Sequence, residues 1–162
     1  MEEIFLDDRK YIIYAGCGKP EKIIFLFADK NEEQSVNMIY SNVCRMYVPN
    51  QRENASNYKE WLLVVCLIDD WNRELSPWKA PAVFGNEYFA GEGAETLSNL
   101  TEHCIPYMIE KYNINIEKCR LFTAGYSLAG LFSLWALHQS YIFSGAISCS
   151  GSLWFNGFEE YV

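Results

Sequence analysis

Short apolar runs recur along this chain, separated by polar and turn-forming residues. Residues 11–15 and 22–28 (KIIFLFA) have the length and the Ile, Phe and Tyr content of buried strands. The run 61–68 (WLLVVCLI) is apolar at every position, as expected for a strand that is covered on both faces. The segments 119–124 and 143–149 follow the same pattern. The hydrophobic pattern therefore predicts a strand at each of these places.

Helical spacing appears between the strands. After the second strand, apolar side chains recur at intervals of three and four residues at Val36, Ile39, Tyr40, Val43 and Tyr47. The segment 94–112 has the same spacing, and Pro106 is the expected site of a kink in that helix. The segment 128–139 is apolar nearly all round, which indicates a buried helix.

The alternation of strands and helices predicts an α/β fold. The sheet should be mostly parallel, with helices on both of its faces. The stretch 71–93 shows neither the apolar run of a buried strand nor the three- and four-residue spacing of a helix. It is rich in Trp, Pro and Gly, so we expect a long ordered loop of the kind that often carries function. The segment 121–137 is too interrupted by Gly and Ser for a membrane span, and a buried strand-turn-helix explains it better.

Composition and charge narrow the function. Half of the 162 residues are hydrophobic, which suffices for one packed domain over residues 1–162. The formal net charge of −8 disfavours nucleic acid and anionic membranes as partners. The first residues are acidic and contain no signal-like apolar segment, so we expect a cytoplasmic protein.

The cysteines and histidines give no metal pattern. The six cysteines contain no C-x-x-C pair and there are two histidines, so we expect neither a metal site nor a cofactor. Several cysteines lie in apolar runs, where a reduced thiol acts as a small buried hydrophobe. We interpret them as structural thiols rather than as disulfides.

The segment 120–130 carries the chemistry. A predicted strand ends, a Gly-x-Ser-x-Ala turn follows with Gly125, Ser127 and Ala129, and an apolar helix begins at once. This is the arrangement of a nucleophile elbow, in which a sharp turn presents the serine hydroxyl at the carboxyl edge of a sheet. Two other interpretations are a tight turn with an ordinary serine and a phosphate-binding turn. The second lacks the lysine of a Walker motif.

The elbow also predicts where an oxyanion would be held. The N–H of Leu128, at the helix start, would be one donor. The second donor should come from the loop after an earlier strand, here residues 28–30, which places Asp29 as the candidate.

Several segments, taken in order, resemble the esterase D, enterochelin esterase and feruloyl esterase branch of the α/β-hydrolases. The resembling segments are KIIFLFAD, WLLVVCLIDD, the helical stretch 95–112, the elbow, and 141–151 (YIFSGAISCSG). The resemblance runs from about residue 20 to residue 162 and implies that Ser127 is the nucleophile of an ester hydrolase. Two positions depart from the family pattern: Ala28-Asp29 replaces the usual His-Gly, and Ala129 replaces the commoner Gly.

A base for Ser127 is not apparent. In this fold the acid and then the histidine follow the serine in the chain. His138 lies eleven residues along the same predicted helix, about 16 Å away at 1.5 Å per residue. His103 precedes the elbow, and the acids after it are Glu159 and Glu160. We therefore expect an α/β-hydrolase fold that lacks its C-terminal strands, with an exposed sheet edge prone to self-association.

The functional hypotheses are a serine esterase and a non-catalytic binding protein on a hydrolase scaffold. A nucleotide-binding domain that uses the turn 125–130 is a weaker third. For the esterase, Trp71, Trp78 and Trp154 are candidate walls of a pocket for a small-molecule ester, and an aromatic wall suits an aromatic acyl group. These rings would alternatively cap the end of the sheet.

Overall fold

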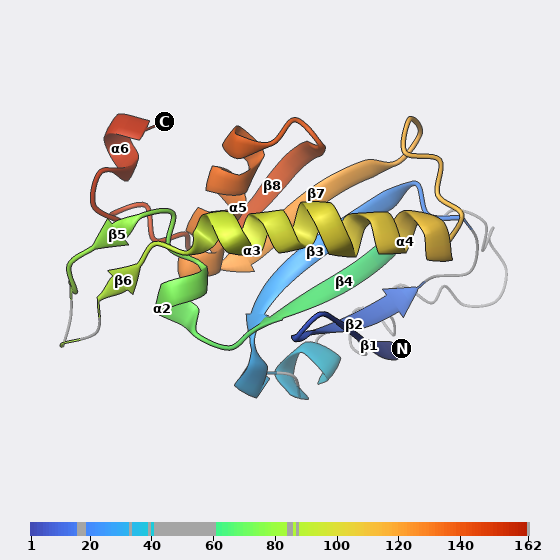
Figure 1. Cartoon of the computed structure of the whole chain (residues 1–162), viewed down its shortest axis with the longest axis horizontal. Coiled ribbons are helices and arrows are strands. Elements are labelled where there is room, and N and C mark those ends of the chain that lie inside the picture. The colour runs from blue at the N-terminus through green and yellow to red at the C-terminus, as the bar shows by residue number, and fades with distance from the viewer. Residues whose placement is uncertain are drawn as a thin grey trace, which may run out of the picture.

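The computed structural model describes residues 1–15, 19–32, 34–38, 40, 61–83, 86 and 88–161. Its centre is a six-stranded sheet with the order β1-β2-β4-β3-β7-β8, which Figure 1 shows face-on. The strands are β1 (Glu2–Leu6), β2 (Arg9–Ala15), β3 (Lys22–Asp29), β4 (Trp61–Ile68), β7 (Arg120–Tyr126) and β8 (Phe143–Cys149). The predicted strands are confirmed, and β1, a short edge strand, is one that the pattern did not predict.

The sheet is parallel over its functional part. β4, β3, β7 and β8 pair in parallel, and the hairpin β1–β2 adds two antiparallel strands at one side. Because the carboxyl ends of parallel strands meet at one edge of a sheet, the residues that follow these four strands lie along a common edge.

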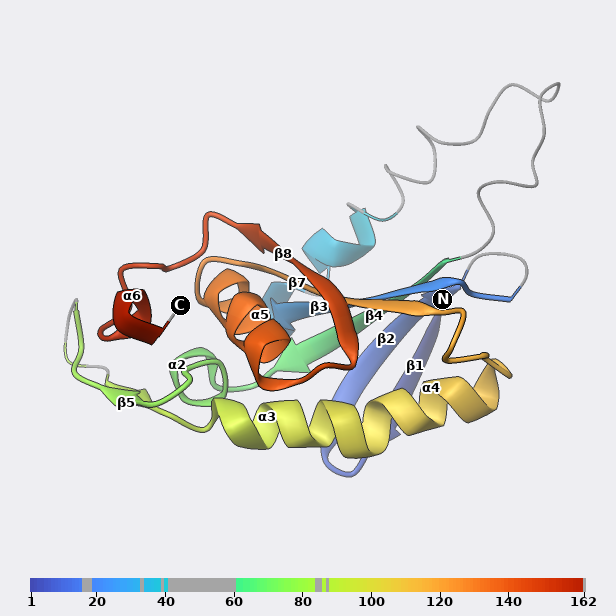
Figure 2. The same cartoon turned by 90° about the horizontal axis from the view of Figure 1, so that it is seen from above.

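Helices cover both faces, as predicted. On one face lie α5 (Leu128–Gln139) and the long helical stretch α3 (Gly93–Asn99), η3 (Leu100–Cys104) and α4 (Ile105–Lys111), and Figure 2 shows them below the sheet. The helical residues 34–38 lie on the opposite face. Residues 39 and 41–47 of the predicted helix lie outside the described residues.

Pro106 changes the long helix in an unexpected way. The turn before it, Leu100–Cys104, is a wider π-helix, in which the Ile105 N–H donates to the Leu100 carbonyl. Because proline has no N–H and its ring crowds the carbonyl four residues earlier, a wider turn accommodates it.

The stretch 71–93 is more regular than predicted. The short helix α2 (Trp71–Glu74) starts it, and the carboxylate of Asp70 caps this helix by accepting a hydrogen bond from the Arg73 N–H at 3.1 Å. A small antiparallel pair follows, β5 (Lys79–Ala80) with β6 (Phe89–Ala90). The expectation of a loop without helices or strands was wrong here. Two-residue strands and a one-turn helix are too short to produce a repeating hydrophobic pattern in the sequence.

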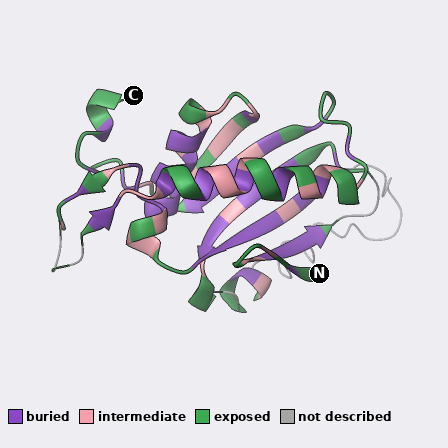
Figure 3. Cartoon of the chain, in the orientation of Figure 1, coloured by how far each residue is buried: buried purple, intermediate pink, exposed green. Residues whose placement is uncertain are grey.

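The core has two layers, one on each face of the sheet. Figure 3 shows how the buried residues run along the strands between them. Alternate residues of β2 belong to different core layers. Tyr11 and Ile13 pack in the layer beneath α3 to α5, whereas Ile12 and Tyr14 pack in the layer on the opposite face. β4 is buried on both faces over most of its length, which explains its continuous apolar run. A last short helix, α6 (Phe158–Tyr161), packs on the first layer through Phe158.

Candidate active site

Ser127 occupies a strained turn between β7 and α5. Its backbone has φ 55° and ψ −121°, a left-handed conformation that residues other than glycine rarely adopt. β7 ends at Tyr126 and α5 begins at Leu128, so the reversal is completed within a single residue. This sharp reversal leaves the Ser127 side chain partly exposed at the carboxyl edge of the sheet.

Two glycines near Ser127, Gly125 and Gly130, have no room for a side chain. A Cβ on Gly125 would lie 2.4–2.5 Å from the backbone and side chain of Ala129, closer than any real contact. A Cβ on Gly130 would lie 2.9 Å from the Ser148 hydroxyl and 3.1 Å from the Gly125 carbonyl oxygen. The small residues of the Gly-x-Ser-x-Ala motif are thus required by close packing between the strand and the helix.

Hydrogen bonds hold the Ser127 backbone in this conformation. Its carbonyl oxygen accepts three: from the N–H groups of Gly130 at 3.0 Å, Leu131 at 3.1 Å and Ser152 at 3.0 Å. Its own N–H donates to the Cys149 carbonyl at 3.0 Å. Ser127 is therefore held by α5 on one side and by the end of β8 on the other.

The Ser127 hydroxyl lies 3.2 Å from the hydroxyl of Ser152. Ser152 is 3% exposed and follows β8, directly after Ser150 and Gly151. The sequence analysis missed this residue. Its position after the strand that neighbours β7 was the available signal, because loops that follow adjacent parallel strands meet at the same edge of the sheet.

One oxyanion candidate, Leu128, directly follows Ser127, and the other, Asp29, ends the strand that pairs with β7. The Leu128 N–H belongs to the first turn of α5, where backbone N–H groups have no acceptor within the helix. Asp29 ends β3, two residues after Phe27, and Phe27 pairs with Gly125. Since Ser127 is two residues after Gly125, Asp29 and Ser127 hold equivalent places on adjacent strands. The Asp29 carboxylate accepts the Asn31 N–H at 2.8 Å.

Two of the three candidate pocket tryptophans belong to one aromatic cluster, formed by Trp78, Phe89, Trp154 and Phe155. Ring centroids are 5.6 Å apart for Trp78 and Phe155, 5.0 Å for Phe89 and Phe155, and 6.5 Å for Phe89 and Trp154. Trp78 is anchored by its Nε1–H, which donates to the Asn156 carbonyl at 2.8 Å, whereas Trp154 is 54% exposed. Trp71 is the first residue of α2 and packs against the same core layer as Phe89 and Phe155.

Solved structures with a similar arrangement are esterases and serine hydrolases. An IroE-like serine hydrolase from Shewanella oneidensis superposes with a TM-score of 0.71 at 17% identity, over 90% of this chain and 47% of that one. The siderophore hydrolase EstA from Aspergillus nidulans gives 0.66 at 17% identity, over 98% and 58%. The enterobactin esterase FES from Shigella flexneri gives 0.57 at 21% identity, over 90% and 33%.

The chain has the α/β-hydrolase fold. Its neighbours are the group of esterases that the sequence segments resemble. Among curated proteins, the uncharacterized protein YbbA of Bacillus subtilis (strain 168) is 34% identical over 102 residues. That alignment covers 60% of this chain and 41% of YbbA, so the chain spans less than half of this relative. No protein-family model matches the chain.

Neither histidine of this α/β-hydrolase chain hydrogen-bonds Ser127. His138 lies near the end of α5, about 16 Å along the helix axis from Ser127, and its ring faces Tyr161 at 6.0 Å. His103 pairs with Asp7 through Nδ1 at 3.3 Å and is half exposed. Glu159 and Glu160 lie on α6 and are exposed.

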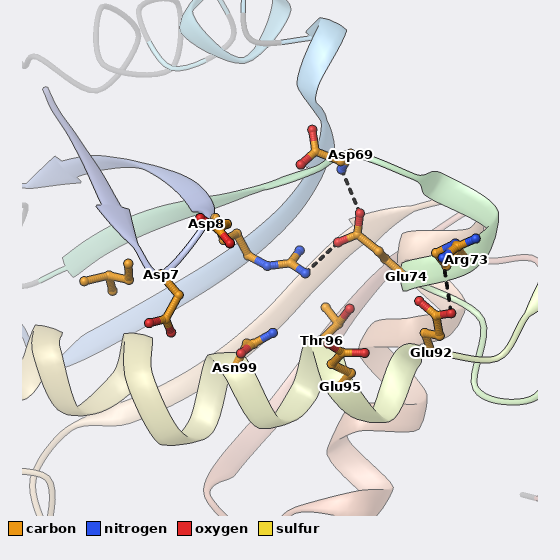
Figure 4. Close-up of a pocket in the computed structure, with 11 residues that line it drawn as sticks. Asp7, Asp8, Asp69, Arg73, Glu74, Glu92, Glu95, Thr96 and Asn99 are labelled. Atoms are coloured by element: carbon orange, nitrogen blue, oxygen red, sulfur yellow. Dashed lines mark hydrogen bonds and ion pairs between the residues drawn. The ribbon is translucent and has the colours of Figure 1, made fainter.

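A polar cavity of about 420 Å³ opens between the β1–β2 turn, the end of β4 and the start of α3 (Figure 4). Six carboxylates and two arginines are among its lining residues, and two ion pairs cross it, Arg9–Glu74 at 2.6 Å and Arg73–Glu92 at 3.5 Å. Its described lining includes neither Ser127 nor any of the three candidate tryptophans. The cavity is therefore a feature distinct from the elbow.

The described residues contain no group of three or more His, Cys, Asp or Glu side chains that could hold a metal ion. Within the same part of the chain, no helix is long and apolar enough to cross a membrane.

Proposed function

We propose that the protein is a serine hydrolase that acts on carboxylic esters with Ser127 as its nucleophile. The observation that carries the proposal is the backbone of Ser127, which is held at a positive φ between a parallel strand and a helix by four hydrogen bonds. Strained residues that their surroundings hold so firmly are characteristic of functional sites. The esterases and serine hydrolases among the structural neighbours support the same class of reaction.

In the proposed reaction, Ser127 Oγ attacks the ester carbonyl carbon while a base removes the hydroxyl proton. The N–H groups of Leu128 and Asp29 stabilise the oxyanion of the tetrahedral intermediate. The intermediate collapses to an acyl-enzyme and releases the alcohol, which takes the proton from the base. The base then takes a proton from a water molecule that attacks the acyl-enzyme, the carboxylic acid is released, and the base passes this second proton to Ser127 Oγ.

The substrate would be a small-molecule ester with an aromatic acyl group. The Trp154 ring is partly exposed and belongs to the aromatic cluster. Trp154 follows β8 and is two residues after Ser152, whose hydroxyl contacts that of the nucleophile. Flat aromatic groups pack well against such rings, with offset or edge-on geometry. The enterobactin esterase, solved with a dihydroxybenzoyl compound, and the ferulic acid esterase among the neighbours support this choice.

The test is covalent labelling of the full-length protein with a fluorophosphonate probe, followed by peptide mapping. We expect the label on Ser127 and none in Ser127→Ala. Absence of label from a folded full-length protein would contradict the proposal. It would favour the alternative, a non-catalytic binding protein on a hydrolase scaffold.

A further inference from the structure

The second hydroxyl at the elbow belongs to a residue that the reaction scheme does not use. Ser152 contacts Ser127 at two points: its N–H donates to the Ser127 carbonyl at 3.0 Å, and its Oγ lies 3.2 Å from the Ser127 Oγ. The two residues are 25 positions apart in the chain. The loop after β8 is thus fixed to both the backbone and the side chain of the nucleophile.

Burial decides which hydroxyl donates. Ser152 is 3% exposed, and among the described residues the hydrogen-bond partner of its hydroxyl is Ser127 Oγ. A buried O–H without an acceptor costs about 1–3 kcal/mol, so the Ser152 proton should point to Ser127. Ser127 is partly exposed, so its own proton has access to water or to a base.

We propose that Ser152 is a positioning residue for the nucleophile. Its hydroxyl donates to Ser127 Oγ, fixes the side-chain rotamer, and leaves the Ser127 proton free for transfer to the base. This inference rests on the proposed esterase function. It assigns to the loop after β8 a role in the chemistry as well as in packing.

The same hydrogen bond favours one half of the reaction. When the acyl-enzyme is hydrolysed, the bond from the acyl carbon to Ser127 Oγ breaks and negative charge develops on this oxygen until the base returns the proton. A hydrogen bond to an ionised oxygen is about twice as strong as one to a neutral oxygen. The Ser152 donor should therefore accelerate this step and leave the binding of the ester unchanged.

The experiment uses the full-length protein, with fluorophosphonate labelling of Ser127 and steady-state hydrolysis of p-nitrophenyl acetate. For Ser152→Ala we expect kcat to fall about tenfold and kcat/KM to fall less, because kcat/KM reports only the steps up to formation of the acyl-enzyme. Ser133→Ala is the matched control, because it also removes a fully buried hydroxyl, one that donates to the Ala129 carbonyl at 2.7 Å within α5. The control should lower the melting temperature while kcat stays within about twofold of wild type.

Each outcome has one meaning. An unchanged kcat in Ser152→Ala, or an equal loss in Ser133→Ala, overturns the positioning role while the labelled wild type keeps the proposed function. A folded wild type without label at Ser127 overturns the proposed function and this inference with it. If Ser152→Ala does not fold, Ser152→Cys replaces it: the thiol is a weaker donor of similar size, so an intermediate kcat supports the role and a wild-type kcat overturns it.

Discussion

At the scale of single residues, the elbow is a balance between strain and hydrogen bonding. Ser127 adopts a backbone conformation that disfavours any side chain, with a typical cost of about 1–3 kcal/mol. The four hydrogen bonds to its backbone oppose this cost and come from two different elements. The strain is therefore stored in the folded state, where it fixes the direction of the hydroxyl.

This strain can be measured with two substitutions. Ser127→Ala and Ser127→Gly both remove the hydroxyl and its contact with Ser152, but only glycine adopts a positive φ without a steric penalty. We expect Ser127→Gly to have a free energy of unfolding about 1 kcal/mol higher than Ser127→Ala, measured by urea denaturation. Equal stability, or a more stable alanine variant, would show that the turn carries no strain.

The sequence identified some of these residues and not others, for physical reasons. Gly125 and Ala129 stand out because close packing restricts residue type, and this restriction is visible in the sequence. Ser152 does not stand out, because its function depends on a contact between loops that are distant in the chain. Side-chain contacts of this kind follow from the tertiary arrangement and leave no local pattern.

At the scale of elements, a helix or strand could be predicted where its hydrophobic pattern was long enough to recognise. β4 and α5 carry long apolar runs, and both were predicted as they occur. The π-helical turn Leu100–Cys104 and the two-residue strands β5 and β6 are too short to show a repeating hydrophobic pattern. They depend instead on local geometry around Pro106 and on packing against the aromatic cluster.

Two cysteine thiols are buried in the core layer that the sheet shares with the long helix. Cys66 on β4 and Cys104 on η3 are buried in the same core layer, and burial raises the pKa of Cys66 to about 12 and that of Cys104 further. Because the thiolate is the nucleophile, iodoacetamide should leave both cysteines unmodified in the folded protein at pH 8 and modify the exposed Cys149 of this chain. Peptide mapping by mass spectrometry checks this.

The raised pKa values also set the sign of a pH effect. Between about pH 9 and pH 12 the unfolded state loses the thiol protons that the folded state retains, so the free energy of unfolding should fall across this range. A Cys66→Ala variant should show a shallower fall. An unchanged slope in that variant would assign the effect to other groups.

At the scale of the whole molecule, the sheet has two unlike edges. The hairpin strand β1 forms one edge, with two Glu residues and salt bridges such as Lys10–Glu3 at 3.1 Å. β8 forms the other edge and pairs on one side with β7, and its Ile147 is 46% exposed. Charged residues protect an edge strand from pairing with another chain, whereas an apolar edge strand invites such pairing.

We therefore expect the chain of 162 residues to self-associate through β8. Ile147→Lys should shift it toward monomers in sedimentation velocity runs at increasing concentration, because a lysine on an edge strand opposes pairing. Val83→Lys is the control, since Val83 is 47% exposed but lies far from β8 in the chain. Association that persists in Ile147→Lys, or a wild-type chain that stays monomeric, would contradict this expectation.

The hydrogen bonds of the elbow connect residues that are close in the chain. Every hydrogen bond described for Ser127 joins residues between 127 and 152, whereas the pairing of β2 with β4 joins residues about fifty positions apart. Closing a short chain segment costs less entropy than closing a long one, so β7, α5 and β8 should assemble early in folding. The nucleophile turn would then be in place before the N-terminal hairpin joins the sheet.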